Sequence, residues 1–250
     1  STEQTVVASE AKDLASQWPM KEAEYQQLLV LFESDRDNWS LLHKFFEDRR
    51  PRYLLGWRDI TNATNERTVI AGVISLAAVG NNMPLVFIRS DYSVKYITAL
   101  QANLCALPLD FVARLKVGGT HLNFFIFKQL PLLSPNQYKQ TDLDYIASRV
   151  MELTYTCHDI KPFAEELGYK GEPFPFDPER RHHIKCELDA YYAKLYGLTR
   201  DELRYILDPA DIMGEDYPSE TFRVLKNKEI KEFGEYRTQR LVLEAYDKLI

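Results

Sequence analysis

Hydrophobic residues recur at helical spacing near both ends of the chain and as short, dense runs in its middle. In the first 50 residues, Leu28, Leu29 and Phe32 share one face of a predicted helix, and a second helical stripe follows after a break at residues 34–38. From Arg52 onward the runs are rich in β-branched and aromatic residues, which is typical of strands. They predict four strands, at residues 53–57, 68–74, 85–89 and 124–127.

A helix is predicted between the third and fourth of these strands. Ser93 is a suitable N-cap residue for it. Its buried face consists of four apolar residues at core spacing, Ile97, Leu100, Leu104 and Leu107. A helix between strands makes the middle of the chain mixed α and β.

The C-terminal half of the chain is predicted to be helical. Thr141 marks the start of one helix, and Asp177 with Pro178 opens another that Gly197 closes. Residues 199–202 have the pattern of a capping box at the start of a third helix.

These patterns predict an α+β fold, with a mixed sheet flanked by helices and a mostly helical C-terminal part. We expect three segments: a helical lead-in at residues 1–50, an α/β module at residues 51–135, and a helical spacer or scaffold at residues 136–250. Proline and glycine are concentrated at residues 170–178, which we expect to be a linker.

The charge of the chain is unevenly distributed. The net charge is −6, but residues 49–128 carry ten Lys or Arg against four acidic residues, a local charge of +6 that leaves −12 for the remainder. Binding a polyanion requires local positive charge rather than a positive total, so the middle segment is where nucleic acid would dock. A solvated charged surface accounts for the same count.

Residue patterns that carry out catalysis or hold a cofactor are sparse. The ten glycines form no Gly-x-Gly and no P-loop, and the chain has no Pro-Pro of the kind that methylation of a flipped base requires. His182, His183 and Cys186 are close in sequence, but adjacent histidines point to different sides of a helix, so we expect surface histidines rather than a metal site. The sequence therefore predicts that this chain alone is not an enzyme.

The cellular location is predicted from the cysteines and the apolar runs. Cys105, Cys157 and Cys186 are odd in number and lack the spacing of a disulfide framework or a zinc knuckle. The longest apolar run, residues 69–79, is too short to cross a bilayer, and the N-terminus has no signal-peptide pattern. We expect a cytoplasmic protein that does not contact a membrane.

Two stretches are more specific than the composition. The first contains Gly-Trp-Arg-Asp-Ile-Thr-Asn at residues 56–62 and Arg-Thr-Val-Ile-Ala at residues 67–71. The second contains Leu-Gln-Ala-Asn-Leu at residues 100–104, Val-Gly-Gly-Thr-His at residues 117–121 and Lys-Gln-Leu-Pro at residues 128–131. In this order they resemble the specificity half of the large adenine-specific DNA methyltransferases of restriction-modification and related phage-defence systems, whose C-terminal part is similar to the TaqI-like target recognition domain.

The resemblance covers the chain from about Arg52 to its C-terminus and implies a division of labour. The chain would recognise double-stranded DNA for a bacterial methyltransferase. An N-terminal methyltransferase domain of the same parent protein would bind S-adenosylmethionine and methylate adenine. No cofactor and no metal are expected in this chain itself.

Residues that could contact DNA lie at the ends of the predicted strands and in the turns between them. Cations position a protein on phosphates, and amides and guanidinium groups read base edges. The candidates are Arg58, Thr61, Asn62, Asn65, Arg67, Arg89, Lys116, Gly118, Gly119, Thr120, His121 and Asn123. Structural alternatives exist for several: Asn62 and Asn65 can cap a turn, Arg67 can pair with Glu66 or Asp59, and Gly118–Gly119 can simply reverse the chain.

Two other functional classes are compatible with the sequence. In the first, the acidic helical part is a protein-interaction scaffold that docks a nuclease, a translocase or a methyltransferase subunit, and DNA is never touched. In the second, which we rank last, the chain is an enzyme of unrecognised chemistry. Trp57 and the tyrosines near residue 192 could stack on bases, but aromatic residues at such spacing are usually core, and we predict that role.

Overall fold

The computed structural model describes residues 26, 50–88, 92–217 and 221–249. The chain divides into two units, Ser1–Pro51 and Arg52–Ile250. Almost all of the first unit, and with it the helices predicted for residues 1–50, lies outside the described residues. The architecture below is that of the second unit.

The strands of this unit form a small antiparallel sheet. It contains β1 (Tyr53–Trp57), β2 (Ala71–Ser75) and β3 (Leu85–Val86) in the order β2-β1-β3. Leu55 of the central strand lies opposite both Val73 and Val86. The predicted α+β class is confirmed, with the correction that all pairs in the described sheet are antiparallel rather than mixed.

The predicted strand at residues 53–57 is confirmed, whereas the next two differ from their predicted bounds. The second begins later, at Ala71, because the backbone N–H groups of Thr68 and Val69 both donate to the Asp110 carboxylate (2.8 and 2.6 Å) and not to a strand. The third pairs only at Leu85–Val86. Gly56 of the central strand is required, because a Cβ there would lie 2.7 Å from the Pro84 carbonyl oxygen.

The fourth predicted strand, at residues 124–127, is wrong. These residues form a short helix, α6 (Phe124–Phe127), because the Asn123 side chain accepts from the Ile126 N–H (3.0 Å) and caps it. The helical turn places Phe124 and Phe127 on one side, where both rings contact Trp57. Packing against that indole therefore overrides the strand preference of an aromatic run.

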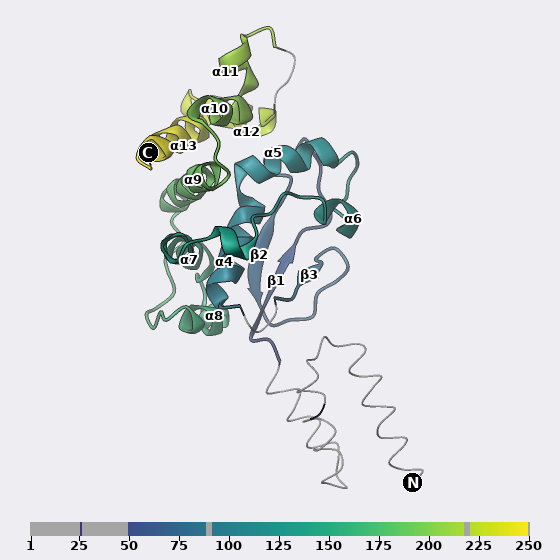
Figure 1. Ribbon diagram of the computed structural model, residues 1–250, viewed down its shortest axis with the longest axis vertical. Coiled ribbons are helices and arrows are strands. Elements are labelled where there is room, and N and C mark those ends of the chain that lie inside the picture. Colours follow the sequence, from purple (N-terminus) through teal and green to yellow (C-terminus); the bar gives the residue numbers. More distant parts are fainter. Residues whose placement is uncertain (1–25, 27–49, 89–91, 218–220, 250) are drawn as a thin grey trace. The chain divides into compact units, whose positions relative to one another are not determined.

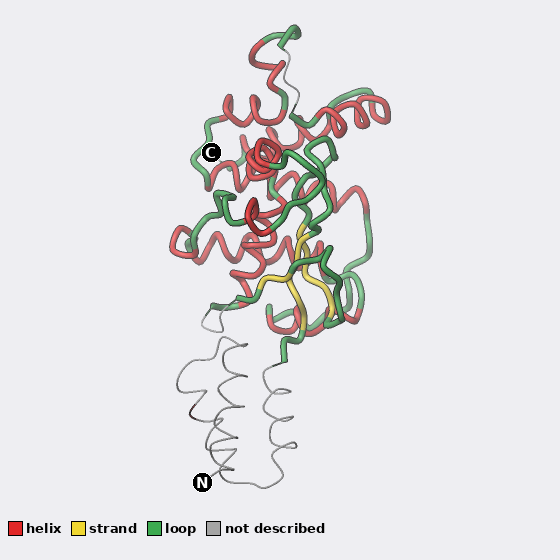
Figure 2. Tube along the Cα trace, turned by 90° about the vertical axis from the view of Figure 1, so that its right-hand side faces the viewer, coloured by secondary structure: helices red, strands yellow, loops and turns green. Residues whose placement is uncertain are grey.

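Helices make up most of the unit, as Figure 2 shows. The α-helices are α4 (Val94–Cys105), α5 (Leu107–Lys116), α6, α7 (Gln140–Thr154), α8 (Lys161–Glu166), α9 (Pro178–Leu195), α10 (Arg200–Leu207), α11 (Pro209–Met213), α12 (Arg223–Phe233) and α13 (Arg237–Asp247). Two 3-10 turns, η1 (Pro135–Gln137) and η2 (His158–Ile160), precede α7 and α8.

Several helix boundaries follow the local signals in the sequence. Asp177 accepts from the N–H groups of the first turn of α9, and Gly197 follows that helix with a positive φ of 72°. The capping box of Thr199 and Glu202 starts α10. These two predictions are confirmed. The helix predicted from Thr141 is α7, which begins one residue earlier, at Gln140, and the Asp142 carboxylate accepts from the N–H of the preceding Lys139 (2.7 Å).

The helices bury the sheet and one another in connected apolar clusters. Figure 1 shows α4 beside the sheet, with α7 next to it. The largest cluster joins residues of β1, β2, α4, α7, α8 and α9. One core therefore contains residues of both the predicted α/β module (51–135) and the predicted helical spacer (136–250). The opposite side of α9 packs on α10, α12 and α13. Tyr191 and Tyr192 are buried in the first cluster, in agreement with their predicted core role.

Among the described helices, no single one is long and apolar enough to cross a bilayer. By length and composition, α4 and α5 together meet the requirement, but they are bent by 58° relative to each other.

Candidate nucleic-acid interface

The two sequence stretches singled out above lie against each other in the fold. The Thr61 N–H donates to the Thr120 carbonyl (2.9 Å), and the Leu122 N–H donates to the Asp59 carbonyl (2.7 Å). Ile60 and His121 form an antiparallel β-bridge between these two hydrogen bonds. Residues 58–66 and 116–123 therefore form one surface feature, which we call the paired loops.

A third loop extends this feature on its other side. The Asp59 N–H donates to the Asn82 carbonyl (2.9 Å), and the Trp57 N–H donates to the Pro84 carbonyl (3.1 Å). The side chains of Asn81 and Asn82 are exposed beside the paired loops. Neither asparagine was among the DNA contacts expected from the sequence, because nothing local distinguishes a turn amide from one that faces a ligand.

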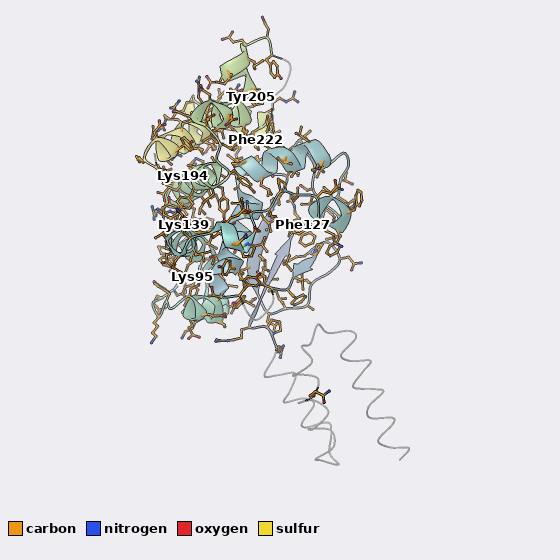
Figure 3. The ribbon with its side chains drawn as sticks, in the orientation of Figure 1. Lys95, Phe127, Lys139, Lys194, Tyr205 and Phe222 are labelled. Atoms are coloured by element: carbon orange, nitrogen blue, oxygen red, sulfur yellow. The ribbon has the colours of Figure 1, made fainter. Side chains whose placement is uncertain are left out.

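The buried Trp57 side chain holds the second of the paired loops by a hydrogen bond to its backbone. Its indole is 1% exposed, and its Nε1 donates to the Leu122 carbonyl (2.9 Å). The ring stacks on Phe127 with centroids 3.9 Å apart and meets Phe124 edge to face at 5.1 Å. Figure 3 labels Phe127 between α6 and the strands. Trp57 is thus a core residue, as predicted.

Arg114 of α5 fixes the first of the paired loops. Its side chain is 7% exposed and pairs with Asp110 (2.8 Å). The same guanidinium donates to three carbonyls of that loop, those of Ala63, Asn65 and Glu66. It also donates to the Thr221 carbonyl and lies over the Phe222 ring at 4.4 Å. The loop backbone is therefore held rigidly by a buried cation that sequence reasoning did not single out.

Arg67, a predicted DNA contact, points into the protein. Its guanidinium forms a bidentate pair with Asp189 of α9 (2.8 and 3.2 Å) and also donates to the Cys105 carbonyl (3.0 Å). The Asp189 side chain is 2% exposed and additionally accepts from the Leu107 N–H (2.7 Å). The partner is neither Glu66 nor Asp59, the two carboxylates considered from the sequence. We therefore assign Arg67 a structural role and remove it from the candidate surface.

Three other candidates form hydrogen bonds within or next to the first of the paired loops. Thr61 is buried, and its hydroxyl donates to the Thr68 carbonyl (2.6 Å). The side-chain oxygen Oδ1 of Asn62 accepts from the N–H and the hydroxyl of Thr64, which caps the turn. The Asn65 amide lies 3.4 Å from the Thr61 hydroxyl. Here the structural alternatives that the sequence left open account for the side-chain contacts.

The remaining candidates are exposed residues of the paired loops. Gly118, Gly119 and Thr120 are exposed at the turn itself. The Lys116 ammonium has one distant partner, the Gln129 side chain at 3.5 Å. Arg58 is exposed, and among the described residues no hydrogen bond or ion pair holds its guanidinium.

His121 and Asn123 are exposed but already have partners. His121 Nδ1 lies 2.7 Å from the Asp59 carboxylate. The Asn123 side chain caps α6. Arg89, the last predicted contact, lies outside the described residues.

The charge near the second loop is positive over a long stretch of chain. Between Asp110 and Asp142 there is no acidic residue, although the whole protein carries −6. Lys128, which sequence reasoning did not include, is exposed at the end of α6, and no side-chain partner holds it among the described residues. Lys116, Lys128 and Arg58 therefore provide the cations of this surface.

A thiol and an imidazole, those of Cys186 and His182, approach each other on α9. Cys186 Sγ lies 3.8 Å from His182 Nε2, but the thiol is buried and burial raises its pKa, so it stays protonated. The same His182 nitrogen lies 3.8 Å from Glu229, so this carboxylate does not orient the ring through its other nitrogen. No group of three or more metal-ligating side chains occurs among the described residues.

Comparison of the chain with protein-family models, with curated proteins and with solved structures found no match. The function must therefore be argued from the geometry of the paired loops and from the residues that form them.

Proposed function

We propose that this chain is the DNA sequence-recognition part of an adenine-specific methyltransferase of the restriction-modification kind, acting in the cytoplasm. The chain grips double-stranded DNA and performs no chemical step. Binding of S-adenosylmethionine and methyl transfer belong to a catalytic domain of the same parent protein. The target adenine must be flipped out of the DNA base stack before it can be methylated. The recognition part would hold the duplex in register while this happens.

The observation that carries the proposal is the meeting of the two motif stretches in the paired loops. Residues 58–66 and 116–123 are far apart in sequence, yet backbone hydrogen bonds join them. Arg114 and Trp57 hold the two loops rigid from beneath. A preorganised loop edge loses little conformational entropy when it enters a groove, which favours recognition.

The outward groups of this edge suit a duplex. Arg58, Lys116 and Lys128 supply exposed positive charge that can neutralise phosphates. Asn81 and Asn82 add exposed amides, which donate to and accept from base edges. The phosphate contacts would set position, and the amides would contribute to sequence preference.

The proposal is tested by measuring DNA affinity as a function of salt. The chain is titrated against a fluorescently labelled random-sequence duplex, and anisotropy is followed between about 50 and 200 mM salt. The test variant is Arg58→Ala/Lys116→Ala/Lys128→Ala. The matched control, Lys170→Ala/Lys231→Ala/Lys248→Ala, removes the same charge from exposed positions elsewhere.

We expect the affinity of the unmodified chain to fall steeply with salt. Each lost phosphate contact lowers the magnitude of the log–log slope by about 0.9, so the test variant should lose up to about 2.7. The control should keep the slope and lose only a small, uniform part of the affinity. Absence of salt-dependent binding, or equal behaviour of the two variants, would refute the proposal.

A second candidate function is a protein-docking scaffold, which one specific observation favours. The C-terminal helices α11 and α12 expose apolar side chains of 39 to 56% exposure, namely Ile212, Met213, Val224, Ile230 and Phe233. Contiguous exposed apolar patches mark protein contacts. If Val224→Ser/Phe233→Ser weakened association with the catalytic domain while the test variant above bound DNA normally, the scaffold would be the better description.

A further inference from the structure

Two phenylalanine rings lie on the surface at the end of the paired loops. Phe125 is 75% exposed and Phe124 is 54% exposed, and they are consecutive residues of α6. Exposure of a large apolar ring is unfavourable unless a ligand or partner covers it. The next aromatic residue of the helix, Phe127, is turned inward onto Trp57, so the outward direction of Phe125 is not shared by the whole run.

The helix that carries these rings is held in place. Asn123 caps its N-terminus, and the Lys128 N–H donates to the Phe124 carbonyl (3.0 Å) at its end. The stack of Trp57 on Phe127 ties the helix to the central strand. Phe125 is therefore presented by a fixed backbone, not by a free loop.

Cations accompany the exposed rings. Lys128 follows Phe125 by three residues on backbone that stays helical through Lys128, so the two residues are neighbours on the helix surface. The Gln129 amide donates to the Phe125 carbonyl (3.1 Å) and its oxygen lies 3.5 Å from the Lys116 ammonium. An aromatic ring flanked by lysines is the combination that binds the bases and the backbone of a nucleic-acid strand.

We propose that Phe125, supported by Phe124, stacks on a DNA base whose face is exposed by local unstacking. The inference rests on the proposed function and names a separate contact within it. A ring can stack only on a base face that is free, and in a paired duplex both faces are covered by neighbours. Extraction of the target base next to the recognition edge would expose such a face.

The test compares a paired duplex with the same duplex carrying one bulged adenine. Affinities of the full chain for both are measured by anisotropy, and 2-aminopurine placed at the bulge reports stacking through quenching of its emission. The variants are Phe125→Ala and Phe125→Trp. The control is Phe176→Ala, because Phe176 is a comparably exposed ring, at 69%, in a different loop.

We expect the unmodified chain to prefer the bulged duplex and to quench the 2-aminopurine. Phe125→Ala should weaken binding to the bulged duplex about 5- to 150-fold, the effect of losing one base–aromatic stack, and abolish the quenching. Binding of Phe125→Ala to the paired duplex should change little. Phe125→Trp should retain both preference and quenching, and Phe176→Ala should behave as the unmodified chain.

The outcomes separate this inference from the proposed function. In one outcome, the chain binds both duplexes with salt dependence while Phe125→Ala loses the same affinity for both, or loses affinity for neither. Either result overturns the inference and leaves DNA recognition standing. If the chain binds neither duplex, the proposed function itself fails. Rings flanked by lysines also suit an anionic membrane surface, so vesicles of phosphatidylserine are the third arm. A Phe125→Ala defect confined to vesicles would overturn stacking on DNA.

Discussion

Substitution of Arg67 by methionine tests the structural role that we assign to this residue. The change removes the bidentate partner of Asp189, whose side chain is 2% exposed, and leaves that carboxylate with one remaining donor, the Leu107 N–H. Methionine keeps much of the apolar length of the side chain, so the loss is mainly electrostatic. Removal of one partner from a buried ion pair costs about 3 to 5 kcal/mol, because the other charge remains buried without compensation.

The measurement is equilibrium unfolding in urea, followed by circular dichroism. At a slope of about 3 kcal/mol per M, the expected loss lowers the midpoint by about 1 to 2 M. The second variant, Arg67→Met/Asp189→Asn, removes the buried charge but keeps an oxygen that can accept from the Leu107 N–H. It should recover much of the loss, because a neutral amide is far less costly to bury than an unpaired carboxylate.

A DNA-binding measurement on the same variants distinguishes a structural from a contacting Arg67. Under conditions where Arg67→Met is still folded, its salt slope should equal that of the unmodified chain. An unchanged urea midpoint together with a reduced salt slope would show that Arg67 reaches DNA, and would refute the assignment.

Two further changes probe the support of the paired loops and the region between α9 and α13. Arg114→Lys should lower the free energy of unfolding by about 1 to 3 kcal/mol and speed amide hydrogen exchange at residues 61–66, because one ammonium cannot replace the guanidinium's bonds to three loop carbonyls. Unchanged exchange would contradict this. Burial lowers the pKa of His182 below its ordinary 6.5, so the unfolded chain takes up this proton first and stability falls as pH drops below about that value. His182→Gln should flatten the pH dependence by at most about 1.4 kcal/mol per pH unit, measured by urea unfolding between pH 7 and pH 5, and an identical dependence would contradict it.

Local signals predicted much of the fold. The cap at Asp177, the glycine at Gly197 and the capping box at residues 199–202 act within a few residues, so their effect is present in the sequence itself. The strand at residues 53–57 was predicted for the same reason, because a short apolar and aromatic run of this length is a local pattern of a buried strand. The run at residues 124–127 failed this logic, since its structure depends on a tryptophan about 70 positions away.

The candidate site was predicted in its location but not in its membership. Both stretches were identified from the sequence, yet their contact depends on backbone bonds between residues about 60 positions apart. Lys128 and the exposed rings of α6 were missed, because a strand prediction for residues 124–127 hides which side chains a helical turn leaves outside. Their DNA contacts remain predictions that the salt and stacking experiments address.

The sequence by itself determined that the middle of the chain is rich in cations, while the tertiary structure decided which of them are available. Arg58 and Arg67 each flank a predicted strand and have an acidic residue next to them in sequence, so local sequence does not tell which one is paired. Only the fold brings Asp189, 122 positions away, against Arg67, and leaves Arg58 facing solvent. Electrostatic pairing acts through space, so the partner of a charge is set by packing and not by neighbours along the chain.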